Sequence, residues 1–170
     1  MTWKEETDKI HQRRELSKLQ GGEKAVAAQH RKGRMTIRER ISALLDKNTF
    51  DEIGMGAGDA ELDENGNLIE FSPANYVLGF GKIDGRRCIV GGEDFTLKGG
   101  SPSAAGQRKS VYTEDLAAKY RIPLIRLHEG AGGSVGGTKK ASLSAPVYEP
   151  HRFRSVAEAM ARVPVATGAM

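Results

Sequence analysis

Residues 76–92 read YVLGFGKIDGRRCIVGG, and this stretch decides the fold. Two apolar runs, YVLGFGKI and RRCIVGG, stand on either side of Asp84-Gly85. Asp-Gly between two such runs is the strongest short signal for a β-hairpin, because both turn positions need a positive φ. The stretch therefore predicts two antiparallel strands joined by a tight turn.

Downstream of the hairpin, helix and strand patterns alternate. The first helix is expected to turn Val111, Leu116 and Tyr120 toward the core. Strands that alternate with crossover helices imply an α/β fold with largely parallel pairing. The expected elements are helices over residues 104–119 and Val156–Arg162 and strands over residues 124–127 and Val163–Thr167.

Upstream of the hairpin, the chain is predicted to be helical over residues 3–19 and 23–31. A third helix begins at Thr36, because Thr36 and Glu39 have the spacing of a capping box, in which each side chain satisfies a free N–H at the helix start. This helix is expected to end near Asn48, and its apolar stripe consists of Ile37, Ile41, Leu44 and Leu45.

The segment between this helix and the hairpin is acidic and rich in glycine. Residues 54–68 therefore predict a loop, with a turn at Asn65-Gly66.

A glycine-rich segment, residues 124–140 (LIRLHEGAGGSVGGTKK), begins in a strand and holds five of the 21 glycines. Glycines after a strand leave main-chain N–H groups open to a ligand, which can be a phosphate or a developing oxyanion. The spacing excludes a dinucleotide fingerprint, since Val135 stands where a third glycine is needed, and a P-loop, since Lys139 comes one place late. An oxyanion site and a glycine loop without a ligand both remain open at this point.

Charge and composition exclude several classes of protein. The net charge is +4, with 11 basic and 6 acidic residues in 1–40, 5 and 11 in 41–100, and 10 and 5 in 101–170. The sequence has no dense basic stripe interleaved with aromatics, as a nucleic-acid binder would have, and no apolar run long enough to span a membrane. Cys88, the single cysteine, is expected to be a buried thiol in a reducing compartment, which favours a cytoplasmic protein.

Three segments in order resemble the carboxyltransferase (β) subunit of biotin-dependent acyl-CoA carboxylases, the group of propionyl-CoA and acetyl-CoA carboxylases. They read GGEKAVAAQHRKGRMTIRERISALLDKNTFDEIG, FGKIDGRRCIVGGEDFTLKGGS and IPLIRLHEGAGGS. The resemblance covers nearly the whole chain but only the N-terminal portion of such a subunit. It implies an N-terminal helical region (1–48) followed by an incomplete crotonase-like carboxyltransferase domain (49–170) built of ββα turns.

The resemblance also implies a reaction. A carboxyl group passes from N-carboxybiotin, delivered on a separate carrier domain, to the α-carbon of a short acyl-CoA. The thioester becomes an enolate whose oxygen is stabilised by main-chain N–H groups. The implied partners are acyl-CoA, a biotin carboxylase with its biotin carboxyl carrier subunit, and further copies of the full-length chain. The isolated segment is expected to be inactive, because the family's site also uses a second domain.

The family's Asp-Ser-Gly-Gly-Ala-Arg segment corresponds here to residues 129–134. The oxyanion pair then corresponds to Ala131 and Gly132, or to Gly132 and Gly133 after a shift of one residue. This chain departs from the family at Ala131, where a methyl replaces a hydrogen, and at Ser134, where the family has arginine. The implied substrate-binding residues are Gly99, Gly100, Ser101 and Lys109, with Lys109 as a phosphate contact or, alternatively, an exposed helix lysine.

Other polar residues are assigned structural roles. His128 is expected to be hydrogen-bonded at a strand end, Arg126 to pair with an acid across the sheet, and Glu93 and Asp94 to act as hydrogen-bond partners. Histidines at metal-ligand spacing are absent from the sequence, which predicts no metal site.

Two other functions stay open. The chain resembles the α subunit of a sodium-linked acyl-CoA decarboxylase equally well over this half of the sequence. A non-catalytic assembly segment, with the basic N-terminal helices as its docking surface, is the third possibility.

Overall fold

The computed structural model describes residues 3–101, 103–130 and 150–169. Its main sheet has five strands in the order β1-β4-β5-β6-β7. The first three pair antiparallel, and β5, β6 and β7 pair parallel, as the alternation of strands and helices predicts. The strands are β1 (Asp51–Glu52), β4 (Tyr76–Ile83), β5 (Arg86–Glu93), β6 (Leu124–His128) and β7 (Val165–Ala169).

The β4–β5 hairpin forms as predicted. Asp84 (φ 49°) and Gly85 (φ 75°) both lie in the left-handed region that a two-residue hairpin turn requires. The carboxylate of Asp46 accepts hydrogen bonds from both of their N–H groups, at 3.0 and 2.8 Å. The turn is therefore fixed by its own geometry and by a carboxylate 38 residues earlier in the chain.

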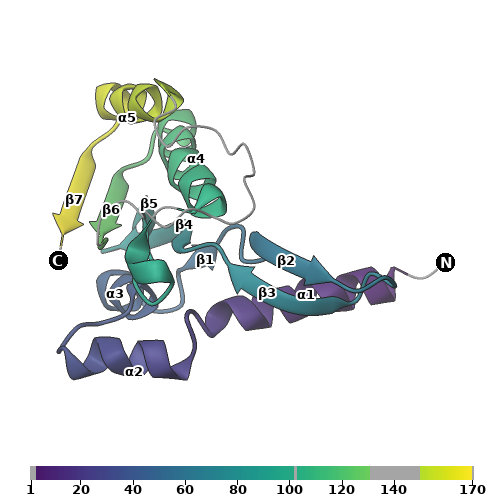
Figure 1. The fold of residues 1–170 in the computed structure, drawn as a ribbon. Helices are drawn as coiled ribbons and strands as arrows, with labels where there is room; N and C mark the ends of the chain where they lie inside the picture. Colours follow the sequence, from purple (N-terminus) through teal and green to yellow (C-terminus); the bar gives the residue numbers. More distant parts are fainter. Residues whose placement is uncertain (1–2, 102, 131–149, 170) are drawn as a thin grey trace.

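Helices cover the two faces of the sheet (Figure 1). On one face, α4 (Ala104–Tyr120) and α5 (Pro150–Arg162) pack over Leu78 and Ile89. On the other face, α3 (Ile37–Leu44) packs over Val77 and Val90. Successive strand residues point to opposite faces, so one hairpin supplies both apolar layers.

The remaining elements form an arm that extends to the right of Figure 1. It consists of α1 (Lys4–Lys18) beside a two-stranded sheet of β2 (Gly58–Leu62) and β3 (Leu68–Pro73), while α2 (Glu23–Arg31) lies below α3. The prediction of a loop over 54–68 is wrong for β2 and for the start of β3. These strands are mostly exposed, so their residues show no apolar alternation, and main-chain pairing alone defines them.

Helix boundaries and faces need smaller corrections. The capping box of α3 is present, but the helix ends at Leu44 instead of near Asn48, and Leu44 is exposed. Leu116 lies in the core as predicted, Val111 is only half-buried, and Tyr120 is 54% exposed. Tyr120 packs at the surface against the Phe80 ring, with 5.7 Å between centroids, because α4 turns small and polar residues toward the sheet.

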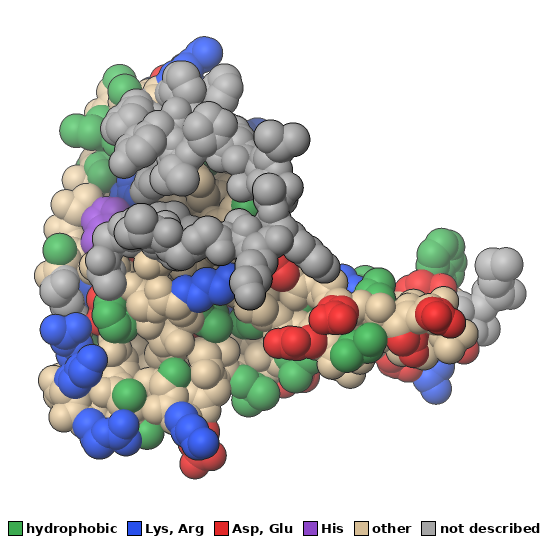
Figure 2. All heavy atoms as spheres, in the orientation of Figure 1, with side chains coloured by type: hydrophobic (Ala, Val, Ile, Leu, Met, Phe, Trp, Pro, Cys, Tyr) green, Lys and Arg blue, Asp and Glu red, His purple; other side chains and the backbone are tan. Residues whose placement is uncertain are grey.

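Charge is separated on the surface, as it is along the sequence. Figure 2 shows Lys and Arg side chains gathered at the lower left, the position of α2, and Asp and Glu side chains along the arm. The exposed groups include Lys24, Arg31 and Lys32 on and just after α2, and Asp59, Glu61 and Glu70 on β2 and β3.

Candidate functional site

The carboxyl end of β6 meets a short turn at Lys98–Gly100 (η1). Gly100 has φ +69°, and a Cβ added to it would lie 2.2 Å from the carbonyl oxygen of Glu129 and 3.0 Å from the Cα of Gly130. Only glycine fits this approach. The structure therefore places the predicted substrate-binding segment (99–101) against the first residue of the glycine-rich loop.

Asn75 holds this turn in place, and sequence reasoning missed it. Its side-chain amide donates to the Ser101 carbonyl at 2.5 Å, and its Oδ1 accepts from the Ser103 hydroxyl at 2.6 Å. Ser103 in turn caps α4 by accepting from the Gly106 N–H. Asn75 is buried between a proline-containing strand end and an apolar strand, and a lone Asn at such a junction gives no distinctive sequence signal.

Glu93, at the end of β5, holds the end of β6. Its carboxylate lies 3.3 Å from His128 Nδ1 and accepts a hydrogen bond of 3.3 Å from the Glu129 N–H. Burial opposes ionisation of Glu93, but the hydrogen bond and charge of His128 outweigh it and hold the pKa below its ordinary value. His128 and Glu93 therefore act as hydrogen-bond partners, as predicted.

The side chain of Glu129 reaches the N-terminal helices. It is 2% exposed, and its Oε1 accepts a hydrogen bond of 2.5 Å from Gln29 of α2. The guanidinium groups of Arg34 and Arg40 lie 3.6 and 3.7 Å from its two oxygens. A buried carboxylate immediately before the glycine loop is thus tied to residues about 100 positions earlier in the chain.

The predicted oxyanion residues Ala131, Gly132 and Gly133 lie outside the described residues. Of the predicted site, the structure therefore describes the residues that lead into the loop and those that lie against its first residue.

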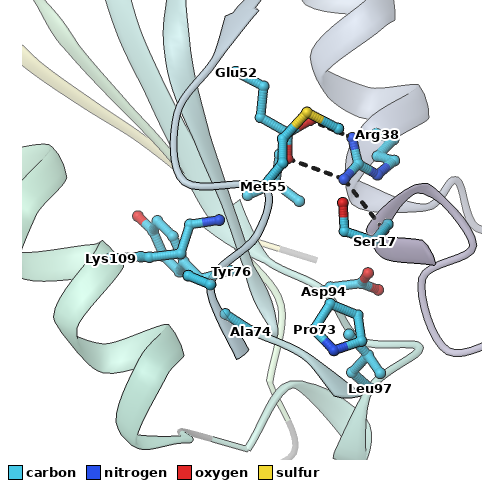
Figure 3. A pocket seen from close by; sticks show the side chains of 12 residues that line it. Ser17, Arg38, Glu52, Met55, Pro73, Ala74, Tyr76, Asp94, Leu97 and Lys109 are labelled. Carbon is cyan, nitrogen blue, oxygen red and sulfur yellow. Dashed lines mark hydrogen bonds and ion pairs between the residues drawn. The ribbon is translucent and has the colours of Figure 1, made fainter. Parts of the chain in front are cut away.

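Lys109 is buried instead of exposed, so the surface-lysine alternative is wrong. It is 9% exposed, and its amine donates to the Gly54 carbonyl at 3.2 Å. Burial, together with the charge of Arg38, lowers its pKa to about 8 despite the opposing charge of Glu52. Figure 3 shows Lys109 and Arg38 entering one small cavity from α4 and α3, where Arg38 is hydrogen-bonded to Glu52 at 2.6 and 3.0 Å.

Lys109 also lines a larger cleft between α4 and residues 56–58, with a volume of about 360 Å³. Arg108 and the half-exposed Tyr112 lie beside it, and the main chain of Gly56 and Gly58 forms the opposite wall. The cleft thus combines cationic, aromatic and bare main-chain groups, which suit an anionic ligand.

The other polar residues have structural partners. Arg126 pairs with Glu114 of α4 at 2.6 Å, so its acid comes from the covering helix and not from across the sheet. Asp94 is buried and accepts from the N–H and hydroxyl of Thr96, and burial raises the pKa of both Asp94 and the Cys88 thiol.

Among the described residues, no group of three or more His, Cys, Asp or Glu side chains is placed to hold a metal ion. The described helices include none with the length and apolar character needed to cross a membrane.

Solved structures with a similar fold are carboxyltransferases with the crotonase-like fold. A transcarboxylase 12S structure with bound methylmalonyl-CoA and methylmalonic acid matches 93% of this chain and 29% of its own, with a TM-score of 0.67 and 26% identity. A single-chain, multi-domain long-chain acyl-CoA carboxylase matches 96% of this chain and 17% of its own, with a TM-score of 0.71 and 30% identity. The expected α/β fold is therefore confirmed.

Curated relatives agree. The acetyl-/propionyl-CoA carboxylase β5 subunit of Mycobacterium tuberculosis is 41% identical over 128 residues, which cover 74% of this chain and 23% of the relative. The mitochondrial propionyl-CoA carboxylase β chain of Homo sapiens is 35% identical over 130 residues (75% and 24%). The methylmalonyl-CoA decarboxylase subunit α of Veillonella parvula is 32% identical over 134 residues (79% and 26%).

The chain thus spans about a quarter of the length of these relatives. The carboxyl transferase domain family matches residues 28–165, which include β1, β4, β5 and β6 of the main sheet, α3, α4 and the turn at Gly100. On this match, and on the shared fold, the chain belongs to the carboxyl transferase domain family.

Proposed function

We propose that this chain is part of the carboxyltransferase component of a biotin-dependent acyl-CoA carboxylase. In this proposal, the α-carbon of a short acyl-CoA accepts a carboxyl group. The observation that carries the proposal is the contact between Gly100 and Glu129-Gly130, because it joins the two segments that the family resemblance assigns to the acyl-CoA and to the oxyanion.

The described residues support a site made of main chain. Gly100 and Gly130 carry no Cβ, and a main-chain group next to each is fixed: Asn75 holds the Ser101 carbonyl, and Glu93 holds the Glu129 N–H. Fixed N–H donors stabilise a thioester enolate without an acidic side chain, and losing one such donor costs about 2.7–4 kcal/mol of transition-state stabilisation. We assign the donors to Ala131–Gly132 or Gly132–Gly133.

The substrate is assigned to Gly99, Gly100, Ser101 and Lys109. The cleft beside Lys109 and Arg108 suits the phosphates of an acyl-CoA, since cationic groups there face bare main chain. N-carboxybiotin on a separate carrier domain supplies the carboxyl group. Among the described residues, only the Gly100 carbonyl oxygen comes within 4 Å of a Cβ placed on Gly130, which leaves room there for the carbonyl oxygen of either reactant.

The proposal includes the wider assembly. We infer a biotin carboxylase and a biotin carboxyl carrier as partner subunits, a homo-oligomer for the full-length protein, and a cytoplasmic location. The division into a helical region (1–48) and a carboxyltransferase region (49–170) belongs to the same proposal.

The reverse half-reaction tests the function. The full-length protein that contains this segment is incubated with free biotin and either malonyl-CoA or methylmalonyl-CoA, and carboxybiotin is measured. Carboxybiotin formation that depends on the acyl-CoA supports the proposal, and its absence with both thioesters favours a non-catalytic assembly segment.

A decarboxylase is not better supported than a carboxylase, since its subunit is 32% identical against 41% for the β5 subunit. The neighbouring genes separate the two, because a biotin carboxylase gene indicates a carboxylase and a membrane-subunit gene a decarboxylase.

A further inference from the structure

Glu129 is held both through its main chain and through its carboxylate. Its N–H donates to Glu93, and its carbonyl lies against the main chain of Gly100, where no side chain could fit. Its carboxylate accepts from Gln29. The next residue, Gly130, begins the glycine-rich loop, so the position of Glu129 sets the point from which that loop leaves the sheet.

The hold on the carboxylate comes from the N-terminal helices. Gln29 is 3% exposed and Arg40 is 8% exposed, so both approach Glu129 inside the protein, while Arg34 approaches from a more exposed position. The N-terminal region also contacts the segment that leads to Gly100, since the Gly21 N–H donates to the Thr96 hydroxyl at 2.9 Å. Both segments that meet at Gly100 are therefore attached to the chain's first 40 residues.

The ion pairs of Glu129 are longer than a pair that serves only to stabilise the fold would be expected to be. The guanidinium groups of Arg34 and Arg40 stand 3.6 and 3.7 Å from the carboxylate oxygens. By contrast, the equally buried pair of Arg126 and Glu114 meets at 2.6 Å. A buried charge that is only partly compensated costs stability, so its presence at the start of the loop calls for another role.

We propose that Glu129 is a positioning residue. Gln29 and Arg40 hold its buried carboxylate, and this fixes the main chain immediately before the residues assigned as oxyanion donors. This inference rests on the proposed function. It assigns the N-terminal helices an indirect part in the reaction, because they hold Glu129, the residue immediately before the glycine-rich loop. Small displacements of catalytic groups are costly, since a shift of about 1 Å can cost about 100-fold in rate.

The test compares E129Q with E114Q in the full-length protein. Glutamine keeps the shape of each side chain and removes its charge. E114Q is the matched control, because Glu114 is also buried and paired with an arginine, but it belongs to α4 and its arginine belongs to β6, not to the N-terminal helices. We expect E129Q to lower kcat by about 10- to 100-fold with KM for acyl-CoA changed less than about twofold. E114Q should lower the melting temperature at least as much and leave kcat unchanged.

R40M extends the test to the arginine side of the contact. It should reproduce the loss of kcat, and the E129Q/R40M double variant should be no slower than the slower single variant, because both changes break one interaction. If E129Q does not fold, R40M carries the same comparison.

Two results would overturn the inference: unchanged kcat in folded E129Q, or a fall in kcat no larger than that of E114Q at equal loss of stability. If the wild-type protein transfers no carboxyl group, the proposed function fails, but hydrogen exchange still decides the inference. E129Q must then speed amide exchange in the peptide that begins at Gly130 more than E114Q does.

Discussion

Replacing Gly100 by alanine tests the contact on which the site depends. Two costs are expected. The first is conformational: an L-residue in the left-handed region costs about 1–2 kcal/mol, and Gly100 has φ +69°. The second is steric: the new methyl would stand 2.2 Å from the Glu129 carbonyl oxygen, and forced repacking of this kind costs about 1–3 kcal/mol. Together they predict that G100A lowers the free energy of unfolding by about 2–5 kcal/mol.

Gly85 provides the matched control. It has φ +75°, and a Cβ added there would meet no atom within 4 Å. G85A therefore carries only the conformational cost of about 1–2 kcal/mol. Urea unfolding followed by circular dichroism, with linear extrapolation to water, measures both variants against wild type.

The difference between the two variants isolates the close approach of Gly100 to the glycine-rich loop. Equal losses of stability in G100A and G85A would refute the reasoning, because they would mean that Glu129 and Gly130 leave room for a methyl group. A larger loss in G100A at an unchanged m-value supports it.

Three further perturbations follow from the described contacts. The pKa of Lys109 is lowered from 10.5 to about 8 in the folded protein, so between these two pH values the unfolded chain binds more protons than the folded one. As the pH rises through that window, the free energy of unfolding of wild type should increase by about 3 kcal/mol relative to K109M. Urea unfolding at several pH values measures this difference. R126M leaves the Glu114 carboxylate buried without its cation and should cost about 3–5 kcal/mol in the same assay, whereas R154A, which breaks an exposed pair, should match wild type. T36A removes one half of the α3 capping box and should cost about 1 kcal/mol, and a melting temperature equal to wild type would contradict that role.

The β4–β5 hairpin and the start of α3 could be predicted because their signals are local. Asp84-Gly85 encodes a turn in two residues, and Thr36 with Glu39 encodes a helix start in four. The apolar alternation of the strands then determines which residues face α3 and which face α4.

The β2–β3 arm could not be predicted by the same means. Strands as exposed as these need no apolar alternation, so their sequence resembles that of a polar loop apart from the turn at Asn65-Gly66. The burial of Lys109 escaped prediction for a related reason. Helix α4 turns small and polar residues toward the sheet, so periodicity does not separate its inner face from its outer one.

The sequence by itself determined the order and type of most elements, the hairpin, the capping box and the family, since each depends on neighbouring residues or on an ordered set of motifs. Only the tertiary structure decided that Gln29 and Arg40 meet Glu129, that Asn75 holds the turn at Ser101, and that Gly100 backs onto the glycine-rich loop. The physical reason is that local periodicity specifies which side of a segment is buried, whereas the pairing of buried polar groups depends on where distant segments pack.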